Sequence, residues 1–231
     1  MTDHVVILAR LARLAAATAR ERHLAERLCE ACRLLLGVDA ASITVSNDNS
    51  SRITLAATNE VAARLEDLQD VLGEGPCHDA FRTGQAVATG LNEEAGRRWP
   101  EFIRAARASV EPVQILCFAM RPGEQVFGTL SLYMASAPEV AESEETAQFL
   151  ADAIGAALLR DPSLDAGITD SGAWSSRATI HQATGMVIAQ LRIGPDDALA
   201  ILRAHAYAHE TTLAEIAEQV VTRRLDFSQG D

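Results

Sequence analysis

The chain contains no lysine: all 20 of its basic residues are arginine, and they face 32 acidic residues, for a formal net charge of −12. This acidity argues against non-specific binding of the whole molecule to nucleic acid or to anionic membranes. No run of 18 or more apolar residues occurs, and no charged-then-apolar leader, so neither a membrane span nor a signal peptide is predicted. Four cysteines without a secretion leader fit a reducing, cytoplasmic location.

Catalytic motifs are also missing. The sequence has no G-x-S-x-G, no H-E-x-x-H and no phosphate-binding loop. The acidic pair Glu93-Glu94 is adjacent in sequence, so its carboxylates diverge instead of meeting at one substrate atom. Cys29 and Cys32 form a C-x-x-C, but inside a helical run and without the second pair of a zinc site. We therefore expect neither an enzyme nor a metal site.

Length and composition favour two folded domains. The 231 residues are 48% hydrophobic, enough for one domain of about 150 residues and a smaller second one. The stretch 162–174 is rich in glycine, serine, aspartate and proline and interrupts the helical periodicity on both sides. The sequence thus predicts a first domain over 1–161, a linker over 162–174 and a second domain over 175–231.

The first domain shows both helical and strand patterns. Strands grouped as hairpins, with helices before and between them, predict an antiparallel sheet covered by helices, an α+β domain. Thr18 and Glu21 are candidate caps for a second helix within the N-terminal helical run. The expected helices cover 4–36, 60–68 and 143–160, and the expected strands cover 42–45, 53–57, 113–120 and 126–134.

The last quarter of the chain predicts three short amphipathic helices. Ile180, Thr184, Val187 and Leu191 recur at steps of three and four, which is typical of one helix face. Gly194-Pro195 ends that pattern and starts a second helix, with proline at its first position. The third helix carries the stripe Leu213, Ile216, Ala217, Val220 and Val221, preceded by Thr212 and Glu215, which match a capping box.

These helices resemble the ANTAR domain of bacterial regulators. The resemblance lies in three blocks in the same order: I-x-Q-A-x-G-M-x-x-x-Q-L from Ile180, A-L-x-x-L-R-x-x-A from Ala198, and L-x-E-I-A-x-x-V-V from Leu213. It implies a dimeric protein that binds paired stem-loops in nascent transcripts and prevents termination. Gln182, Thr184 and Gly185 of the first block are then candidate RNA contacts. Many family members carry a lysine near the position of Thr184.

Residues 175–231 hold five arginines and seven acidic residues, a net charge of −2. Because phosphate neutralisation usually dominates nucleic-acid affinity, RNA binding by this module must depend on a local patch. The alternative for each candidate is an arginine solvated on a helix face or a histidine packed against a neighbouring helix. The candidate patch consists of Arg177, His181, Arg203, His205 and His209, with Tyr207 available to stack on an unpaired base.

The run Leu-Gly-Glu-Gly-Pro-Cys-His-Asp-Ala-Phe-Arg-Thr-Gly-Gln-Ala-Val, from Leu72 to Val87, precedes a helix and a strand. With the order of elements around it, this run makes residues 20–160 similar to a GAF domain. The resemblance implies a sensor whose relatives bind cyclic nucleotides, haem, small aromatics or nothing, so the cofactor is unspecified and a small-molecule effector is expected. Gly73, Gly75 and Pro76 predict a tight turn, and Cys77 is either a reactive thiol or a small buried core residue.

Together these features predict a cytoplasmic transcription antitermination regulator. A GAF-like sensor would control the pairing of two ANTAR-like modules, with the N-terminal helix and the helix over 143–160 as the expected homodimer surfaces. Two alternatives stay open: a helix-turn-helix DNA-binding regulator, and a protein–protein signalling module without RNA binding.

Overall fold

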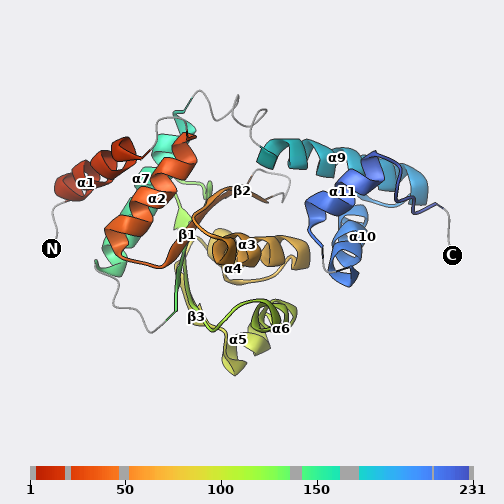
Figure 1. Ribbon diagram of the computed structural model, residues 1–231, viewed down its shortest axis with the longest axis horizontal. Coiled ribbons are helices and arrows are strands. Elements are labelled where there is room, and N and C mark those ends of the chain that lie inside the picture. Colours follow the sequence, from red (N-terminus) through yellow and green to blue (C-terminus); the bar gives the residue numbers. More distant parts are fainter. Residues whose placement is uncertain are drawn as a thin grey trace. The chain divides into compact units, whose positions relative to one another are not determined.

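A computed structural model describes residues 4–18, 22–46, 52–135, 142–161, 172–209 and 211–228. The chain forms two compact units (Figure 1). One unit contains an antiparallel sheet with helices on both faces, and the other contains the helices of the C-terminal part. The predicted fold class, an α+β domain followed by a small helical domain, is confirmed.

The sheet of the first unit has five strands in the order β2-β1-β5-β4-β3, and each neighbouring pair is antiparallel. Both predicted hairpins are present, as β1–β2 and β4–β5. Every residue of β5 is buried, which requires cover on both faces of the sheet. The strands are β1 (Ala40–Ser46), β2 (Arg52–Ala57), β3 (Val87–Gly90), β4 (Gln114–Met120) and β5 (Gly128–Met134).

Two sets of helices cover this sheet (Figure 1). Three helices pack together on one face: α1 (His4–Ala17), α2 (Leu24–Leu36) and α7 (Glu144–Leu159). The opposite face carries α3 (Glu60–Leu72) and α4 (Pro76–Thr83). Two more helices, α5 (Glu93–Arg98) and α6 (Pro100–Ser109), connect β3 to β4.

The start of α2 differs from the prediction. The residue before its first turn is His23, without a side-chain cap, and not Thr18. The Thr18 hydroxyl instead donates to the carbonyl of Leu14 at 3.1 Å, at the end of α1. Threonine hydroxyls often donate to the backbone carbonyl four residues earlier, and Thr18 makes this hydrogen bond in place of the predicted cap. Glu21 lies outside the described residues.

Helices α5 and α6 are not predicted by the sequence pattern. They are six and ten residues long, too short to show a clear hydrophobic period. Their start signals are nevertheless present. The Asn92 side chain accepts a hydrogen bond from the Ala95 N–H, and Pro100 occupies the first turn of α6.

The glycine turn between α3 and α4 forms as predicted. Gly73 ends α3 in the left-handed region, with φ of 66°, and Gly75 precedes α4 with φ of 141°. A Cβ on Gly75 would lie only 2.5 Å from the Gln69 side-chain oxygen. Glycine is therefore required at position 75 both by its φ angle and by the close approach of Gln69. Pro76 then takes the first helical position.

The second unit contains α9 (Gly172–Leu191), α10 (Pro195–Ala208) and α11 (Leu213–Val221). The capping box of Thr212 and Glu215 is present as predicted. On α9, Ala183 is buried where the predicted stripe had Thr184, which is half-buried. Helix α9 starts within the stretch predicted as a linker. The fully buried core residues are Ala183, Val187, Ala198, Leu202, Ala206, Leu213, Ile216, Ala217 and Val220.

The face of the sheet that α3 covers is unusually polar. Side chains alternate along each strand, and the register pairs Ser42 with Ser131 and Cys117 with Ser131, so these three point to the same side. A single carboxylate from α3, Glu66, projects into this polar layer and is only 2% exposed. The layer therefore contains a charged group where most sheet–helix interfaces are apolar.

Glu66 is surrounded by donors. Its Oε1 accepts hydrogen bonds from the hydroxyls of Ser42 at 2.7 Å, Ser131 at 2.9 Å and Tyr133 at 2.8 Å. Its Oε2 accepts from the Thr44 hydroxyl at 3.1 Å and from Arg52 Nη2 at 3.1 Å. This carboxylate therefore ties α3 to β1, β2 and β5 at once.

The donors also keep Glu66 ionised. Burial alone would raise the pKa of Glu66, but the charge of Arg52 and the hydrogen bonds from Ser42, Tyr133 and Ser131 hold the pKa below its usual range. Because the pKa is depressed in the folded state, the stabilisation is complete above the unfolded-state pKa and is lost as the pH falls through the folded-state value.

Substitution Glu66→Gln should lower the free energy of unfolding at pH 7 by about 3 kcal/mol, because it removes the buried ion pair with Arg52. The difference between wild type and variant should begin to shrink as the pH falls below the unfolded-state pKa of about 4.3, and it should be lost only below the depressed folded-state pKa of Glu66. Urea unfolding measures both effects, with Trp99 as the reporter of this unit in a Trp174→Phe background. The exposed Glu124 provides the control Glu124→Gln, for which a change within about 0.5 kcal/mol is expected. A pH-independent difference between wild type and E66Q would contradict this account.

Candidate functional site

The predicted RNA contacts on α9 lie on its surface. Gln182 and Gly185 are exposed, and Thr184 is half-buried, with its hydroxyl donating to the Ile180 carbonyl at 2.7 Å. The Thr184 hydroxyl proton is therefore already used within the helix. Arg177 and His181 also belong to α9, but their side chains lie outside the described part of the structure.

Gly185 leaves an open spot in the middle of this helix. A Cβ built at this position would meet no atom of the described residues within 4 Å. Glycine inside a helix costs roughly 0.5–1 kcal/mol relative to alanine, and neither packing nor a positive φ requires it here. A glycine that neither the packing nor the backbone conformation of the chain requires is typical of a place where another molecule approaches the backbone closely.

The predicted patch on α10 is partly packed into the unit. His205 stacks on His209, with ring centroids 4.1 Å apart, and meets Phe227 edge-on at 5.3 Å. Arg203 is half-buried, and its Nε has no hydrogen-bond partner among the described residues. Tyr207 is half-buried as well. Of these predicted residues, only His209 is exposed.

Desolvation by burial lowers the pKa of His205, and the neighbouring His209 lowers it further. The imidazole of His205 is therefore mostly neutral at pH 7 and a poor partner for phosphate. The packed alternative for this histidine fits the structure better than a cationic contact.

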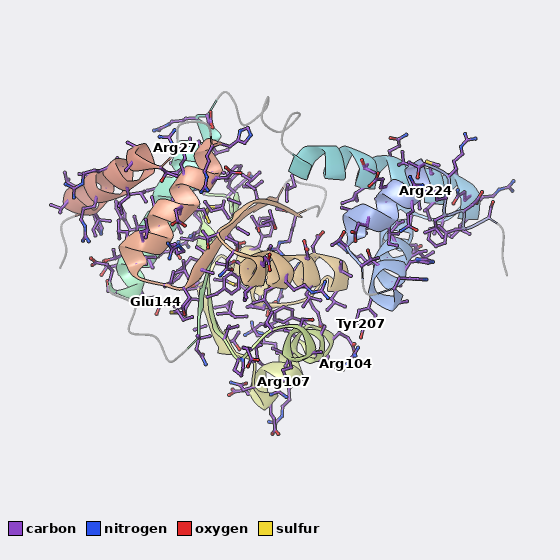
Figure 2. The ribbon with its side chains drawn as sticks, viewed as in Figure 1. Arg27, Arg104, Arg107, Glu144, Tyr207 and Arg224 are labelled. Atoms are coloured by element: carbon purple, nitrogen blue, oxygen red, sulfur yellow. The ribbon has the colours of Figure 1, made fainter. Side chains whose placement is uncertain are left out.

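Three exposed arginines that the sequence analysis did not select lie in the same unit. Arg192 follows α9, and Arg223 and Arg224 follow α11. Arg224 is labelled in Figure 2. The N–H of Phe227 donates to Gln190 Oε1 at 3.2 Å, which ties the segment after α11 to the last turn of α9. The segment that follows Arg223 and Arg224 therefore meets the end of α9, which Arg192 directly follows. We call Arg192, Arg223 and Arg224 the arginine end.

Two of these arginines have unusual backbones. Arg192 has φ of 56° and Arg223 has φ of 57°, in the left-handed region that glycine or asparagine usually occupies after a helix. Such a conformation costs on the order of 1 kcal/mol for a residue with a side chain. No ion pair joins the arginine end to any other described residue. Its guanidinium groups are thus available to a ligand. The sequence feature that could have revealed these arginines is an arginine directly after a predicted helix, where a glycine usually ends the helix.

A cavity of about 490 Å³ lies beside α4 in the first unit, lined in part by the glycine turn. Asp79 organises one wall: its carboxylate accepts from Arg82 at 2.8 Å, Arg98 at 2.6 Å and the Trp99 indole N–H at 3.2 Å. Burial would raise the pKa of Asp79, but the hydrogen bond from Arg82 and the charge of Arg98 hold it below its usual range. Each guanidinium keeps further N–H groups that a bound anion could use.

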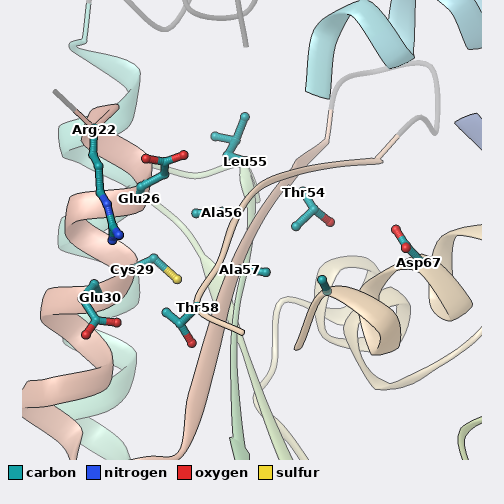
Figure 3. A pocket seen from close by; sticks show the side chains of 11 residues that line it. Arg22, Glu26, Cys29, Glu30, Thr54, Leu55, Ala56, Ala57, Thr58 and Asp67 are labelled. Atoms are coloured by element: carbon teal, nitrogen blue, oxygen red, sulfur yellow. The ribbon is translucent and has the colours of Figure 1, made fainter. Parts of the chain in front are cut away.

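A second cavity of about 520 Å³ lies between α2, β2 and α3 (Figure 3). Glu26 and Glu30 line it from α2 and Asp67 from α3, with Arg22 as the one basic lining residue. This wall favours a cationic or neutral ligand over an anion. Among the described residues, no group of three or more metal-ligating side chains is placed to hold a metal ion.

The two units match known domain families in chain order. Residues 18–159 match the GAF domain and residues 171–221 match the ANTAR domain. A sensor domain is thus followed by an RNA-binding antitermination domain, two kinds that are typically non-enzymatic. The chain belongs to the GAF family and is a GAF and ANTAR domain-containing protein, as its motifs predict. No curated protein matches it.

Solved structures show the sensor fold. The GAF domain of A. aeolicus nlh2 in an inactive state is 13% identical, with a TM-score of 0.50, covering 68% of this chain and 97% of that one. The GAF domain of a Coxiella burnetii phosphoenolpyruvate-protein phosphotransferase is 15% identical, with a TM-score of 0.49 and coverage of 71% and 96%. At this identity the likeness concerns the fold alone. No described helix is long and apolar enough to cross a membrane.

The His205 pKa gives a direct test of the packing in the ANTAR unit. Its imidazole should titrate below the unperturbed value of about 6.5 in a two-dimensional NMR titration of the full chain. Replacing His209 with alanine should raise that midpoint, because a neighbouring positive charge is removed. A wild-type midpoint at or above the unperturbed value would mean that His205 is not desolvated.

Proposed function

We propose that this chain is a transcription antitermination regulator that binds tandem RNA stem-loops in nascent transcripts through its ANTAR unit, under control of its GAF sensor. One observation carries the proposal beyond the family match. The arginine end presents three exposed arginines, none of which forms an ion pair with a described carboxylate, although Asp226 interacts with Arg223 through its charge. Guanidinium groups suit phosphate because they bind its oxygens in a bidentate manner.

The net charge of −2 does not prevent such binding. Salt screens exposed charges over about 8 Å at physiological ionic strength, so a phosphate responds to nearby residues more than to the total. Glu215 is already held by Thr211 and Thr212 in the cap of α11. Asp226 interacts with Arg223, but Ser228 is its main partner. The arginine end therefore remains locally basic.

We propose that the chain acts as a homodimer through its α1, α2 and α7 layer. The sensor exposes large apolar side chains on these helices: Val5 is 73% exposed on α1, Leu34 49% on α2 and Leu159 53% on α7. Covering such residues is favourable. A dimer carries two ANTAR units, so binding of one stem-loop raises the effective concentration of the second unit at the next stem-loop.

The sensor input is best placed at the cavity beside Asp79. Arg82 and Arg98 are already oriented there by one carboxylate, which lowers the cost of ordering them around a small molecule. A small-molecule effector with a carboxylate or phosphate group fits this wall. The effector would change the pairing of the two ANTAR units and thereby the engagement of paired stem-loops.

RNA recovered with the tagged protein and sequenced should be enriched in tandem hairpins. In mobility-shift assays, such tandem hairpins should bind more tightly than either hairpin alone, and duplex DNA should not compete. Competition by duplex DNA would favour the helix-turn-helix alternative. No RNA binding at low salt, with or without cell extract metabolites, would favour the protein-docking alternative.

The double substitution Arg192→Gly/Arg223→Gly separates charge from folding. Glycine suits both left-handed positions, so thermal stability should stay equal or rise. RNA affinity should nevertheless fall about tenfold, or ~1.4 kcal/mol, and the salt dependence should weaken by roughly one unit of slope per arginine. Arg97→Ala, on the surface of α5, is a control that removes one positive charge from the sensor and should leave RNA binding unchanged. Unchanged RNA affinity in the double variant would remove the arginine end from the interface.

Gly185→Ala should move stability and RNA affinity in opposite directions. The open surroundings allow the methyl group, so the ANTAR unit should gain about 0.5–1 kcal/mol of stability. RNA binding should weaken severalfold if the RNA approaches the helix backbone at this point. Gly96→Ala in α5, where the nearest atom to the new methyl is 3.8 Å away, should stabilise the sensor without an RNA effect. Equal RNA binding by wild type and G185A would show that the interface lies elsewhere.

A further inference from the structure

Two cysteine thiols meet in the interior of the GAF sensor. Cys77 stands in the first turn of α4, and Cys117 lies within β4, 40 positions later in the sequence. Their sulfur atoms are 3.0 Å apart, and both side chains are fully buried. A disulfide bond needs about 2.05 Å between its sulfurs, so an approach of roughly 1 Å would suffice to form one.

We propose that Cys77 and Cys117 are a redox-active thiol pair that a peroxide converts into a disulfide inside the sensor. This proposal concerns the sensor's own chemistry and does not depend on RNA binding. Its link to regulation rests on the function proposed above.

The surroundings give the two sulfurs different roles. Gln69 Nε2 donates a hydrogen bond to Cys77 Sγ at 3.0 Å, and the next residue along α4, His78, lines the 490 Å³ cavity, so Cys77 is the thiol next to solvent-accessible space. Burial raises the pKa of Cys117 well above its ordinary value, and its neighbour Cys77 raises it further. Cys77 is therefore the thiol that meets the oxidant, and Cys117 is the thiol that resolves the product.

The reaction balances with hydrogen peroxide as the oxidant. Cys77 sulfur attacks one peroxide oxygen, the S–O bond forms and the O–O bond breaks, and the departing hydroxide takes the thiol proton and leaves as water. Cys117 sulfur then attacks the Cys77 sulfenic acid, the S–S bond forms and the S–O bond breaks, and a second water leaves with the Cys117 proton. The two sulfurs lose two electrons and the peroxide gains them. The 3.0 Å separation already meets the near-attack distance for the second step.

The oxidant has a defined route. Gly75 and His78, on either side of Cys77 in the sequence, line the 490 Å³ cavity, but Cys77 itself is covered. Peroxide would therefore need a local opening of this turn to reach Cys77, so we expect slow oxidation.

Disulfide formation changes the polar layer around Glu66. The Cys77 sulfur lies 3.4 Å from Glu66 Oε1 and donates its proton toward it, and it lies 3.0 Å from the Ser131 hydroxyl. Oxidation removes that donor and draws the start of α4 toward β4. Because α4 also carries Asp79 and Arg82, oxidation alters the wall of the cavity where we place the effector.

The test uses the reduced full-length chain, treated with hydrogen peroxide, quenched by alkylation and digested without reductant. Mass spectrometry should find a peptide pair joined through Cys77 and Cys117, which dithiothreitol separates again. In Cys117→Ser, dimedone should label Cys77 as a trapped sulfenic acid. The variant Cys29→Ser/Cys32→Ser should form the same linked peptide, because burial raises the pKa of both thiols, that of Cys32 to about 12. Absence of the linked peptide in the wild type, or a link through other cysteines, would overturn the proposal.

The thiol chemistry and its link to RNA binding can be tested separately. The wild-type experiment needs no variant, so poor folding of C117S would not obscure it. RNA mobility shifts with oxidised and reduced wild type should differ at least threefold in affinity and return to the starting value after reduction. A linked peptide with unchanged RNA affinity would keep the thiol chemistry and refute its regulatory link, whereas no RNA binding in either state would refute the proposed function alone.

Discussion

The buried Glu66 carboxylate is the constraint on which the sensor depends. A charge with 2% exposure is tolerated only where several donors replace water, and here four hydroxyl groups and one guanidinium do so. These donors come from three strands, so the sheet must keep its register for the carboxylate to stay satisfied. Apolar side chains would tolerate a small shift of α3 along the sheet, but these hydrogen bonds would be broken by such a shift. Glu66 therefore fixes the geometry in which the Gln69 side chain and the glycine turn receive α4.

That fixed geometry has a consequence for signalling. A sensor needs a part that moves at low cost, and α3 is held too firmly to be that part. The short helix α4 is better suited, because a glycine turn precedes it and its contacts with Glu66 and Ser131 are made by the Cys77 sulfur. Sulfur hydrogen bonds are weaker than those of hydroxyl groups. A ligand beside Asp79 and a bond between Cys77 and Cys117 would both act on this same helix.

Much of the architecture could be predicted from the sequence, for reasons that particular residues show. The β4–β5 hairpin, α7 and the capping box at Thr212 are encoded locally, by apolar runs and a short-range signal. The Glu66 network could not be predicted, because its members come from distant segments and each of them looks like an ordinary surface residue in the sequence. The short helices α5 and α6 lack a period to detect. On α9, Val187 of the predicted stripe is buried as expected, but one turn earlier the buried residue is Ala183 and not Thr184, since small residues leave the buried face poorly marked.

The candidate RNA-binding surface was harder to predict than the fold, because the sequence shows which side chains are basic but not which of them are exposed in the folded protein. His205 has a basic side chain, yet its imidazole ring packs against His209 and Phe227 and is only partly exposed. Arg192 and Arg223 look unremarkable in the sequence, yet they occupy positions where glycine would be less strained. A residue retained against its backbone preference in an exposed, unpaired position needs a reason outside the folded chain. In the function proposed for this chain, the phosphates of RNA would supply that reason.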